Sequence, residues 1–340
     1  MKKIDMTHGP IGRKTIRFAL LLALTGMLQQ VFNTIDTIIM GQFVGKEAMA
    51  AVGSNAPIIG FIVPFFIGIS LGGNVVISQM TGKGNQDGIH RAVFTTLAFA
   101  LFAGLLVMVV SEAVARPLLS LLLVPEALLP LSLEYLRIFF LALPGILMYN
   151  FSAAIFRSQG DTRTPLLCLA AAGVIKVIIS YSLVVFFHQG VAAVAISTTC
   201  ATLLSSAMLV TILLRSTHVI HLDLKASLFD LYILREILRI GTPAGVQAAV
   251  FGLSNIVIQS AINSLGADVM AASAAAFNIE ILVYIFINAF GQTCTTFVGQ
   301  NFGAGNMARC RRVGLITTAQ NLAFTVLIGA PMLYFAEPLL

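Results

Sequence analysis

An aspartate inside an apolar helix is the residue of this sequence whose chemistry stands out first. Asp36 lies in TGMLQQVFNTIDTIIMGQFVG, residues 25–45, a stretch that otherwise has the composition of a membrane-spanning helix. At about 100° per residue, its helix face also carries Thr25, Gln29, Asn33 and Met40. An ionised carboxylate at the bilayer centre costs about 2.5–3.5 kcal/mol, so such residues are usually functional. We expect this face to meet protein or water; the alternative is that Asp36 is solvated at the outer interface.

A lysine and a serine form a second polar position in the middle of another apolar run. Lys176 and Ser180 occur in GVIKVIIS at a spacing that places both on one face of a helix. A charge inside a membrane is as anomalous for lysine as for aspartate, and it marks a candidate functional position. The alternative is a structural lysine whose ammonium binds a carbonyl or reaches the membrane surface along its flexible stem.

Two further helices carry polar faces that are suited to line a cavity. One face advances in steps of four residues and consists of Glu280, Tyr284, Asn288 and Gln292. The other follows Pro243, which frees a backbone carbonyl, and includes Gln247, Asn255 and Gln259. We expect both faces to point toward a central cavity.

The sequence offers no set of residues for catalysis or for a metal ion. The four cysteines, Cys168, Cys200, Cys294 and Cys310, are scattered without a CxxC spacing, and the histidines lack further ligands nearby. The polar connections are too short for a soluble catalytic domain. We therefore expect neither an enzyme nor a metal protein, and no cofactor.

The elements that position these residues are membrane helices. The chain of 340 residues is 58% hydrophobic and only 10% charged, which is too apolar for a water-soluble fold. Apolar runs bounded by charge, Gly or Pro predict nine helices, over residues 16–40, 52–80, 91–111, 131–156, 166–187, 191–214, 241–264, 270–299 and 313–335. We expect an all-α polytopic membrane protein.

Basic residues are distributed unevenly between the predicted connections. Most Lys and Arg residues precede the first predicted helix or follow the second, fourth, sixth and eighth helices. Because cytoplasmic loops are enriched in Lys and Arg, we expect a multi-pass protein of the plasma (cytoplasmic) membrane with a cytoplasmic N-terminus. The net charge of +6 is then explained by topology, and no nucleic-acid partner is implied. We expect a monomer in the lipid bilayer.

An internal repeat divides the chain. SQMTGKGNQDGIHRAV, residues 78–93, resembles GQNFGAGNMARCRRVG, residues 299–314, at a constant offset of 221. An even number of predicted helices separates the copies, as in two-lobe transporters with parallel repeats. The longest polar connection, residues 215–239, then separates an N-terminal six-helix lobe (1–214) from a C-terminal lobe (240–340). On this offset the second lobe has counterparts of only three helices, so we expect a longer whole protein with about three more.

Four short segments form a recognisable pattern. They are NTIDTIIMGQF (33–43), FRSQGDTRTP (156–165), IGTPAGVQ (240–247) and GQNFGAGN (299–306). Together they resemble the multidrug and toxin extrusion (MATE) family of cation-coupled antiporters, in the order and on the helices typical of that family. The resemblance implies a two-lobe fold of six plus six helices that exchanges protons or sodium ions for bulky, often cationic, organic drugs or toxins. We expect FRSQGDTRTP to be a cytoplasmic loop without a role in transport chemistry.

The resemblance assigns Asp36 to the cation site of the N-terminal lobe, where Asn33 is a further candidate. The family commonly places Asn and a second Asn or Asp four residues apart on the fifth helix, at the positions of Lys176 and Ser180. Lysine offers no oxygen to a hard cation such as sodium. We therefore favour proton over sodium as the coupling ion, or an Asp36–Lys176 pair that takes the place of the cation.

The polar cavity faces become candidates for binding the small-molecule substrate. They comprise Gln29, Gln247, Asn255, Gln259, Glu280, Tyr284, Asn288 and Gln292. Glu280 resembles the acid of an NIE segment in one bacterial branch of the family, and it is suited to attract a cationic drug or to carry a second proton. The alternative is an acid solvated at a helix end. Two rival functions stay open: a flippase for a lipid-linked saccharide or other amphiphile, and an inactive truncated transporter.

Overall fold

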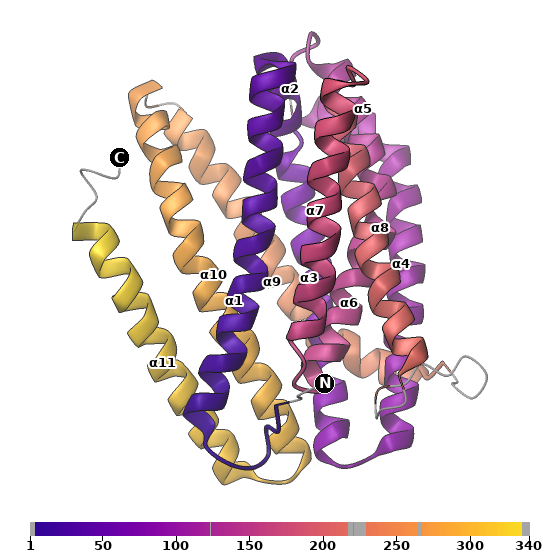
Figure 1. Cartoon of the computed structure of the whole chain (residues 1–340), viewed down its shortest axis with the longest axis vertical. Helices are drawn as coiled ribbons and strands as arrows, with labels where there is room; N and C mark the ends of the chain where they lie inside the picture. Colours follow the sequence, from indigo (N-terminus) through magenta and orange to yellow (C-terminus); the bar gives the residue numbers. More distant parts are fainter. Residues whose placement is uncertain are drawn as a thin grey trace.

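The computed structural model describes residues 4–122, 124–216, 220, 229–263, 265 and 267–334. Within these residues all regular secondary structure is helical, which confirms the predicted all-α class (Figure 1). The elements are α1 (Ile11–Ile39), the π-helical turn η1 (Met40–Val44), α2 (Lys46–Gly53), α3 (Ala56–Gly82), α4 (Gln86–Leu121), α5 (Leu129–Leu141), α6 (Leu143–Ser158), α7 (Arg163–Val185), α8 (Val191–Arg215), α9 (Leu231–Asn263), α10 (Ala267–Gly303) and α11 (Met307–Tyr334).

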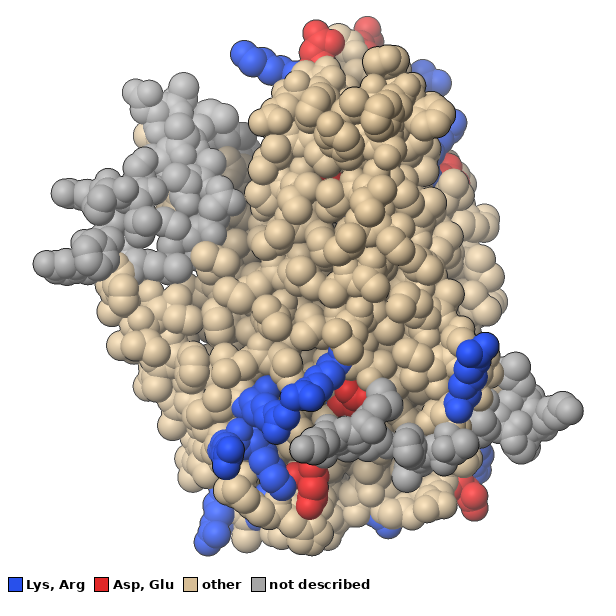
Figure 2. All heavy atoms as spheres, in the orientation of Figure 1, with Lys and Arg blue, Asp and Glu red and all other residues tan. Residues whose placement is uncertain are grey.

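Eight of the described helices are long and apolar enough to cross a membrane, or nine if α5 and α6 form one bent span. The prediction of one unbroken helix over residues 131–156 is wrong, because the chain breaks at Ala142 and turns by 43°. Pro144 lies in the first turn of α6, where its missing N–H group costs no helical hydrogen bond, and it therefore favours a new helix start at this point. On the face shown in Figure 2, charged side chains gather at the two ends and leave an uncharged band between them, as a membrane protein requires.

The helix α9 begins at Leu231, inside the connection predicted over residues 215–239. The Asp230 carboxylate accepts hydrogen bonds of 2.9 and 3.1 Å from two backbone N–H groups of the first turn and so starts the helix early. The last part of the predicted linker is therefore helical, whereas residues 217–219 and 221–228 lie outside the described residues. The division into two lobes stays a prediction.

The internal repeat corresponds to two turns of the same conformation, between α3 and α4 and between α10 and α11. Gly84 and Gly305 have φ angles of +69° and +74°, a region that favours glycine. Asn85 and Asn306 follow them, and each accepts a backbone N–H bond of 3.0 Å at the start of the next helix. The repeated residues are therefore those that the turn itself requires.

Next to these turns, at the lower end of the molecule in Figure 1, α3 and α10 cross with reciprocal contacts between equivalent residues. A methyl group on Gly82 would collide with the carbonyl of Gln300, and one on Gly303 would collide with the carbonyl of Gln79. Small residues permit this close approach of helices in a membrane protein. The two halves of the chain are thus in tight contact at the lower end.

The helix α1 is held by both halves of the chain (Figure 1). Near its N-terminal end, Phe18 belongs to a buried cluster with Phe297 of α10 and Val313 of α11. Near its C-terminal end, Ile39 belongs to a buried cluster with Val184 of α7. A shift of the N-terminal end of α1 would therefore affect α10 and α11, whereas a shift of its C-terminal end would affect α7.

Candidate functional site

Asp36 and Lys176 form a buried ion pair between α1 and α7. The Nζ atom of Lys176 lies 2.5 Å from Oδ2 of Asp36, and the two side chains are only 9% and 10% exposed. Both residues lie in helices that are apolar and long enough to span a membrane. Each charge compensates the other, since an unpaired charge would be very costly at such a position. The structure therefore contains the Asp36–Lys176 pair, which was one of the alternatives left open by the sequence.

Close packing of α1 on α7 brings the two charges together. Gly173 lies one helical turn before Lys176, and a methyl group there would collide with the ring of Phe32. Phe32 in turn lies one turn before Asp36 on α1. The glycine therefore sets the distance between the helices at which the carboxylate and the ammonium meet.

The surroundings of the ion pair contain polar groups that are not fully used. The second carboxylate oxygen of Asp36 and the hydroxyl of Ser180 are both buried without a hydrogen-bond partner. Tyr135 of α5 is also buried, and its hydroxyl lies within electrostatic reach of Asp36. Asn33 is different, because it is exposed and is not part of the pair. Tyr135 was not predicted, since no spacing in the sequence relates α5 to α1.

A cavity of about 730 Å³ lies between α3 on one side and α9 and α10 on the other. Its lining consists of Gly53, Ala56, Pro57, Gly60, Pro64, Ala248, Phe251, Gly252, Asn255, Ile256, Gln259, Phe277, Glu280, Ile281 and Tyr284. The rings of Phe251 and Tyr284 are parallel, with their centroids 5.3 Å apart. Glu280 is the charged residue among these lining residues. The cavity thus combines a largely apolar wall with one acid, a typical composition for a small-molecule site.

Half of the predicted cavity residues line this space. Asn255, Gln259, Glu280 and Tyr284 do so, whereas the exposed side chains of Gln29 and Gln247 are not among the lining residues. Asn288 and Gln292 also lie outside the lining. Asn288 donates to the carbonyl of Tyr284 at 3.1 Å, and the side-chain oxygen of Gln292 accepts a hydrogen bond from Arg157 of α6. The apolar wall from α3 was missed, because its Gly and Pro residues are equally compatible with helix packing alone.

Polar contacts close the molecule between α3, α6 and α10 at its lower end. Asn74 of α3 donates to the carbonyl of Ala154 and accepts from the hydroxyl of Thr296, both at 3.0 Å. Gln300 of α10 donates to the carbonyl of Ser158 at 2.6 Å. These bonds join α3 and α6 to each other and to α10, which belongs to the second half of the chain. Opening the molecule at this end would have to break them.

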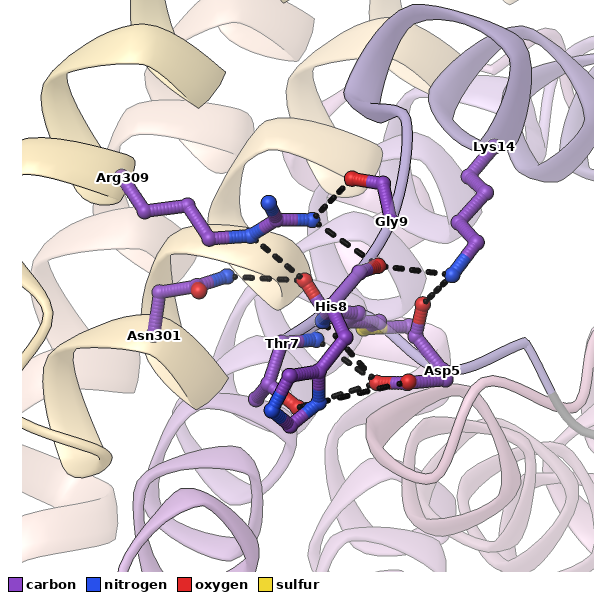
Figure 3. A network of polar contacts seen from close by, with 8 residues as sticks. Asp5, Thr7, His8, Gly9, Lys14, Asn301 and Arg309 are labelled. Carbon is purple, nitrogen blue, oxygen red and sulfur yellow. Dashed lines mark hydrogen bonds and ion pairs between the residues drawn. The ribbon is translucent and has the colours of Figure 1, made fainter.

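The segment before α1 adds a further connection across the lower end (Figure 3). The N–H group of Ile4 donates to the carbonyl of Gly160 at 3.2 Å, in the connection after α6. The carbonyl of the fully buried Met6 accepts from Asn301 at 3.1 Å and from Arg309 at 3.3 Å. Arg309 also donates to the carbonyls of His8 and Gly9, at 3.1 and 3.0 Å. The segment is therefore bonded to both repeats.

The conformation of this segment is stabilised by Lys14 of α1 and by hydrogen bonds to the Asp5 carboxylate. Lys14 donates to the carbonyls of Asp5 and His8 at 2.8 and 2.7 Å. Partial burial raises the pKa of the Asp5 carboxyl, but hydrogen bonds from Thr7 and His8 outweigh it and hold the pKa below its usual value. The carboxylate form of Asp5 is therefore the form that fits this turn.

Comparison with known proteins gives a consistent family. The MatE family model matches residues 22–182 and 243–340. The probable multidrug resistance protein YoeA of Bacillus subtilis is 27% identical over 310 residues, which cover 89% of this chain and 67% of that protein. A protein of Shewanella oneidensis named FAD transporter is 27% identical over 346 residues, which cover 98% of this chain and 75% of that protein.

Solved structures show the same fold. An outward-facing multidrug resistance MATE family transporter of the MOP superfamily superimposes with a TM-score of 0.92, at 19% identity, over 100% of this chain and 75% of that one. A MOP superfamily transporter from Pyrococcus furiosus, described as having a binding pocket of reverse polarity, superimposes with a TM-score of 0.93 at 19% identity. The match covers 100% of this chain and 75% of that chain.

Proposed function

The chain belongs to the MatE family of membrane proteins, and we propose that it exports organic, often cationic, compounds in exchange for protons. The observation that carries the proposal is the buried Asp36–Lys176 pair, a charge arrangement inside the membrane with no evident structural need. The names of the relatives, which include multidrug resistance proteins, support transport of small organic molecules.

The cavity supports a bulky and partly aromatic substrate. Its volume of about 730 Å³ lies within the usual range of sites for organic molecules. The parallel rings of Phe251 and Tyr284 offer a flat surface, and Glu280 offers a negative charge to a cationic group. The substrate accordingly binds between α3, α9 and α10, with its charged group toward Glu280.

The ion pair favours proton over sodium coupling. Sodium binding needs several oxygen ligands, and the ammonium of Lys176 already occupies one oxygen of Asp36 and supplies none of its own. A proton needs only one oxygen, and the second oxygen of Asp36 is without a partner. Protonation neutralises the carboxylate and removes its attraction for Lys176. The ammonium of Lys176 then has to find another acceptor or water, and this movement loosens α1 from α7. Because α10 and α11 hold the other end of α1, this change reaches the contact between the repeats.

The proposed orientation places the lower end of Figure 1 in the cytoplasm. The first turns of α1 and α11, which carry Arg13, Lys14, Arg309, Arg311 and Arg312, lie at this end, and so does the turn with Lys83 between α3 and α4. This agrees with the positive-inside tendency. The polar contacts that close the lower end then separate the cavity from the cytoplasm. In this conformation the cavity belongs to the outward-facing half of the transport cycle.

Efflux from vesicles under separate ion gradients tests the proposal. The protein is reconstituted, and export of a cationic dye is followed first under a pH gradient and then under a sodium gradient. We expect the pH gradient alone to drive export. Export driven by sodium at constant pH would overturn proton coupling, and a lack of dye movement under both gradients would overturn the proposed exporter function.

A further inference from the structure

Arg157 at the end of α6 is a cation whose hydrogen-bonding groups are incompletely used. One of its terminal nitrogens, Nη1, donates to the side-chain oxygen of Gln292 on α10 at 3.0 Å. Its Nε atom is buried and has no hydrogen-bond partner. None of the ion pairs formed within the described part of the chain includes Arg157. A neutral amide is therefore the partner of a positive charge at the contact between the two repeats.

Two other basic residues within the helices have acidic partners. Lys176 pairs with Asp36 at 2.5 Å, and Arg137 pairs with Glu112 at 3.7 Å. The Arg157 side chain is partly buried, and its Nε atom is fully buried without a partner. A buried polar group of a charged side chain is costly without a partner, so the lack of an acid at Arg157 needs an explanation. The planar guanidinium group is suited to bind two oxygens of one carboxylate or phosphate. An oxyanion is the chemical group that would complete this site.

The position of Arg157 connects it to the cavity. Its partner Gln292 is the last residue of the polar face that begins with Glu280 and Tyr284, both of which line the cavity. At about 1.5 Å per residue, Glu280 and Gln292 are separated by about 18 Å along α10. One face of α10 thus has a negative charge at its upper end and meets the positive charge of Arg157 at its lower end.

We propose that Arg157 binds an oxyanion, a carboxylate or a phosphate, and is the residue that recognises such a group on an exported compound. This inference rests on the proposed exporter function and adds a residue that determines its specificity. In the present conformation, Gln292 occupies Nη1 of the guanidinium group, and the Nε atom is buried. Opening of the lower end separates α6 from α10 and frees Arg157 to bind an oxyanion from the cytoplasmic side. Closure returns Gln292 to Arg157, so that the amide competes with the oxyanion and helps to release it.

A pair of matched dyes tests the inference. Rhodamine B is a zwitterion with a free carboxylate, and its ethyl ester has the same aromatic cation without the negative charge. Binding of both dyes and of inorganic phosphate is measured on the whole protein in lipid nanodiscs, by fluorescence polarisation and by calorimetry. The variants are Arg157→Gln, Arg157→Lys and, as a matched control, Arg163→Gln, which removes an exposed arginine at the start of the next helix.

We expect Arg157→Gln to weaken rhodamine B binding by about tenfold or more, the size of a lost charge-assisted hydrogen bond, while the Kd of the ester changes less than about twofold. Arg157→Lys retains the charge and should lose less affinity for rhodamine B, which keeps the test informative if the glutamine variant folds poorly. Arg163→Gln should change neither Kd.

Equal losses for both dyes, or no loss for either, would overturn the inference. Phosphate binding that Arg157→Gln abolishes, with unchanged binding of both dyes, would retain the oxyanion site but refute its assignment to the exported compound. If the unmodified protein binds neither dye, the proposed exporter function is in doubt, and the phosphate measurement still decides whether Arg157 forms an oxyanion site.

Discussion

Replacing Lys176 by methionine should destabilise the protein by an amount that depends on pH. The substitution retains the length of the side chain but leaves the carboxylate of Asp36 buried without its partner, in a site where both side chains are about nine-tenths enclosed. Removing one member of such a pair costs about 3–5 kcal/mol at neutral pH. Protonation of Asp36 removes the unpaired charge, so we expect the loss to become smaller as the pH falls. Unfolding of the purified protein in mixed micelles of increasing SDS content measures the difference.

A double variant and an exposed control make this test specific. The Asp36→Asn/Lys176→Met double variant has no unpaired charge, and we expect its free energy of unfolding to lie within about 1–2 kcal/mol of the unmodified protein. Lys46→Met replaces an exposed lysine and should change stability by less than about 0.5 kcal/mol. Strictly additive effects of the two single substitutions, or a Lys176→Met loss independent of pH, would refute an energetic coupling between Asp36 and Lys176.

Three further predictions concern the packing of α1, the cavity and the segment before α1. Gly173→Ala introduces a methyl group against the ring of Phe32 and should cost about 1–3 kcal/mol in unfolding experiments; unchanged stability would show that α1 approaches α7 less closely than described. Glu280→Gln should weaken binding of rhodamine B ethyl ester about tenfold but leave the neutral dye Nile red unaffected, and equal losses would assign Glu280 a structural role. Arg309→Ala removes three hydrogen bonds to the carbonyls of residues 6–9, so amide exchange there should accelerate about tenfold by mass spectrometry; unchanged protection would contradict the described connection.

The contact between Asp36 and Lys176 was accessible from the sequence because of the physics of the membrane. A charged side chain inside an apolar membrane helix has a large desolvation cost, and pairing with an opposite charge lowers it. The sequence could not place Asn33 or Tyr135 in the same way. Helical periodicity shows which residues share a face of one helix, but it does not show which other helix that face contacts.

The cavity face of α10 illustrates the same limit. Glu280 and Tyr284 line the cavity as their spacing suggested, but α10 continues below it, and Gln292 contacts Arg157 at the closed end. Arg157 itself lies in a segment for which the sequence suggested no transport chemistry. Its missing acidic partner is a property of the packed structure, since it depends on side chains that are distant in the chain. The break at Ala142 was missed for a simpler reason, because the apolar pattern continues through it although Pro144 disfavours an unbroken helix.

Efflux by the Asp36→Asn variant, measured together with dye binding, tests the central claim of proton coupling through Asp36. A monovalent cation exchanged for one proton moves no net charge, so a difference of one pH unit sustains about a tenfold dye gradient. We expect the variant, whose amide cannot exchange a proton, to bind the dye within about threefold of the unmodified protein but to build no gradient. A gradient as large as that of the unmodified protein, formed by folded Asp36→Asn protein under the same pH difference, would remove Asp36 from the coupling mechanism.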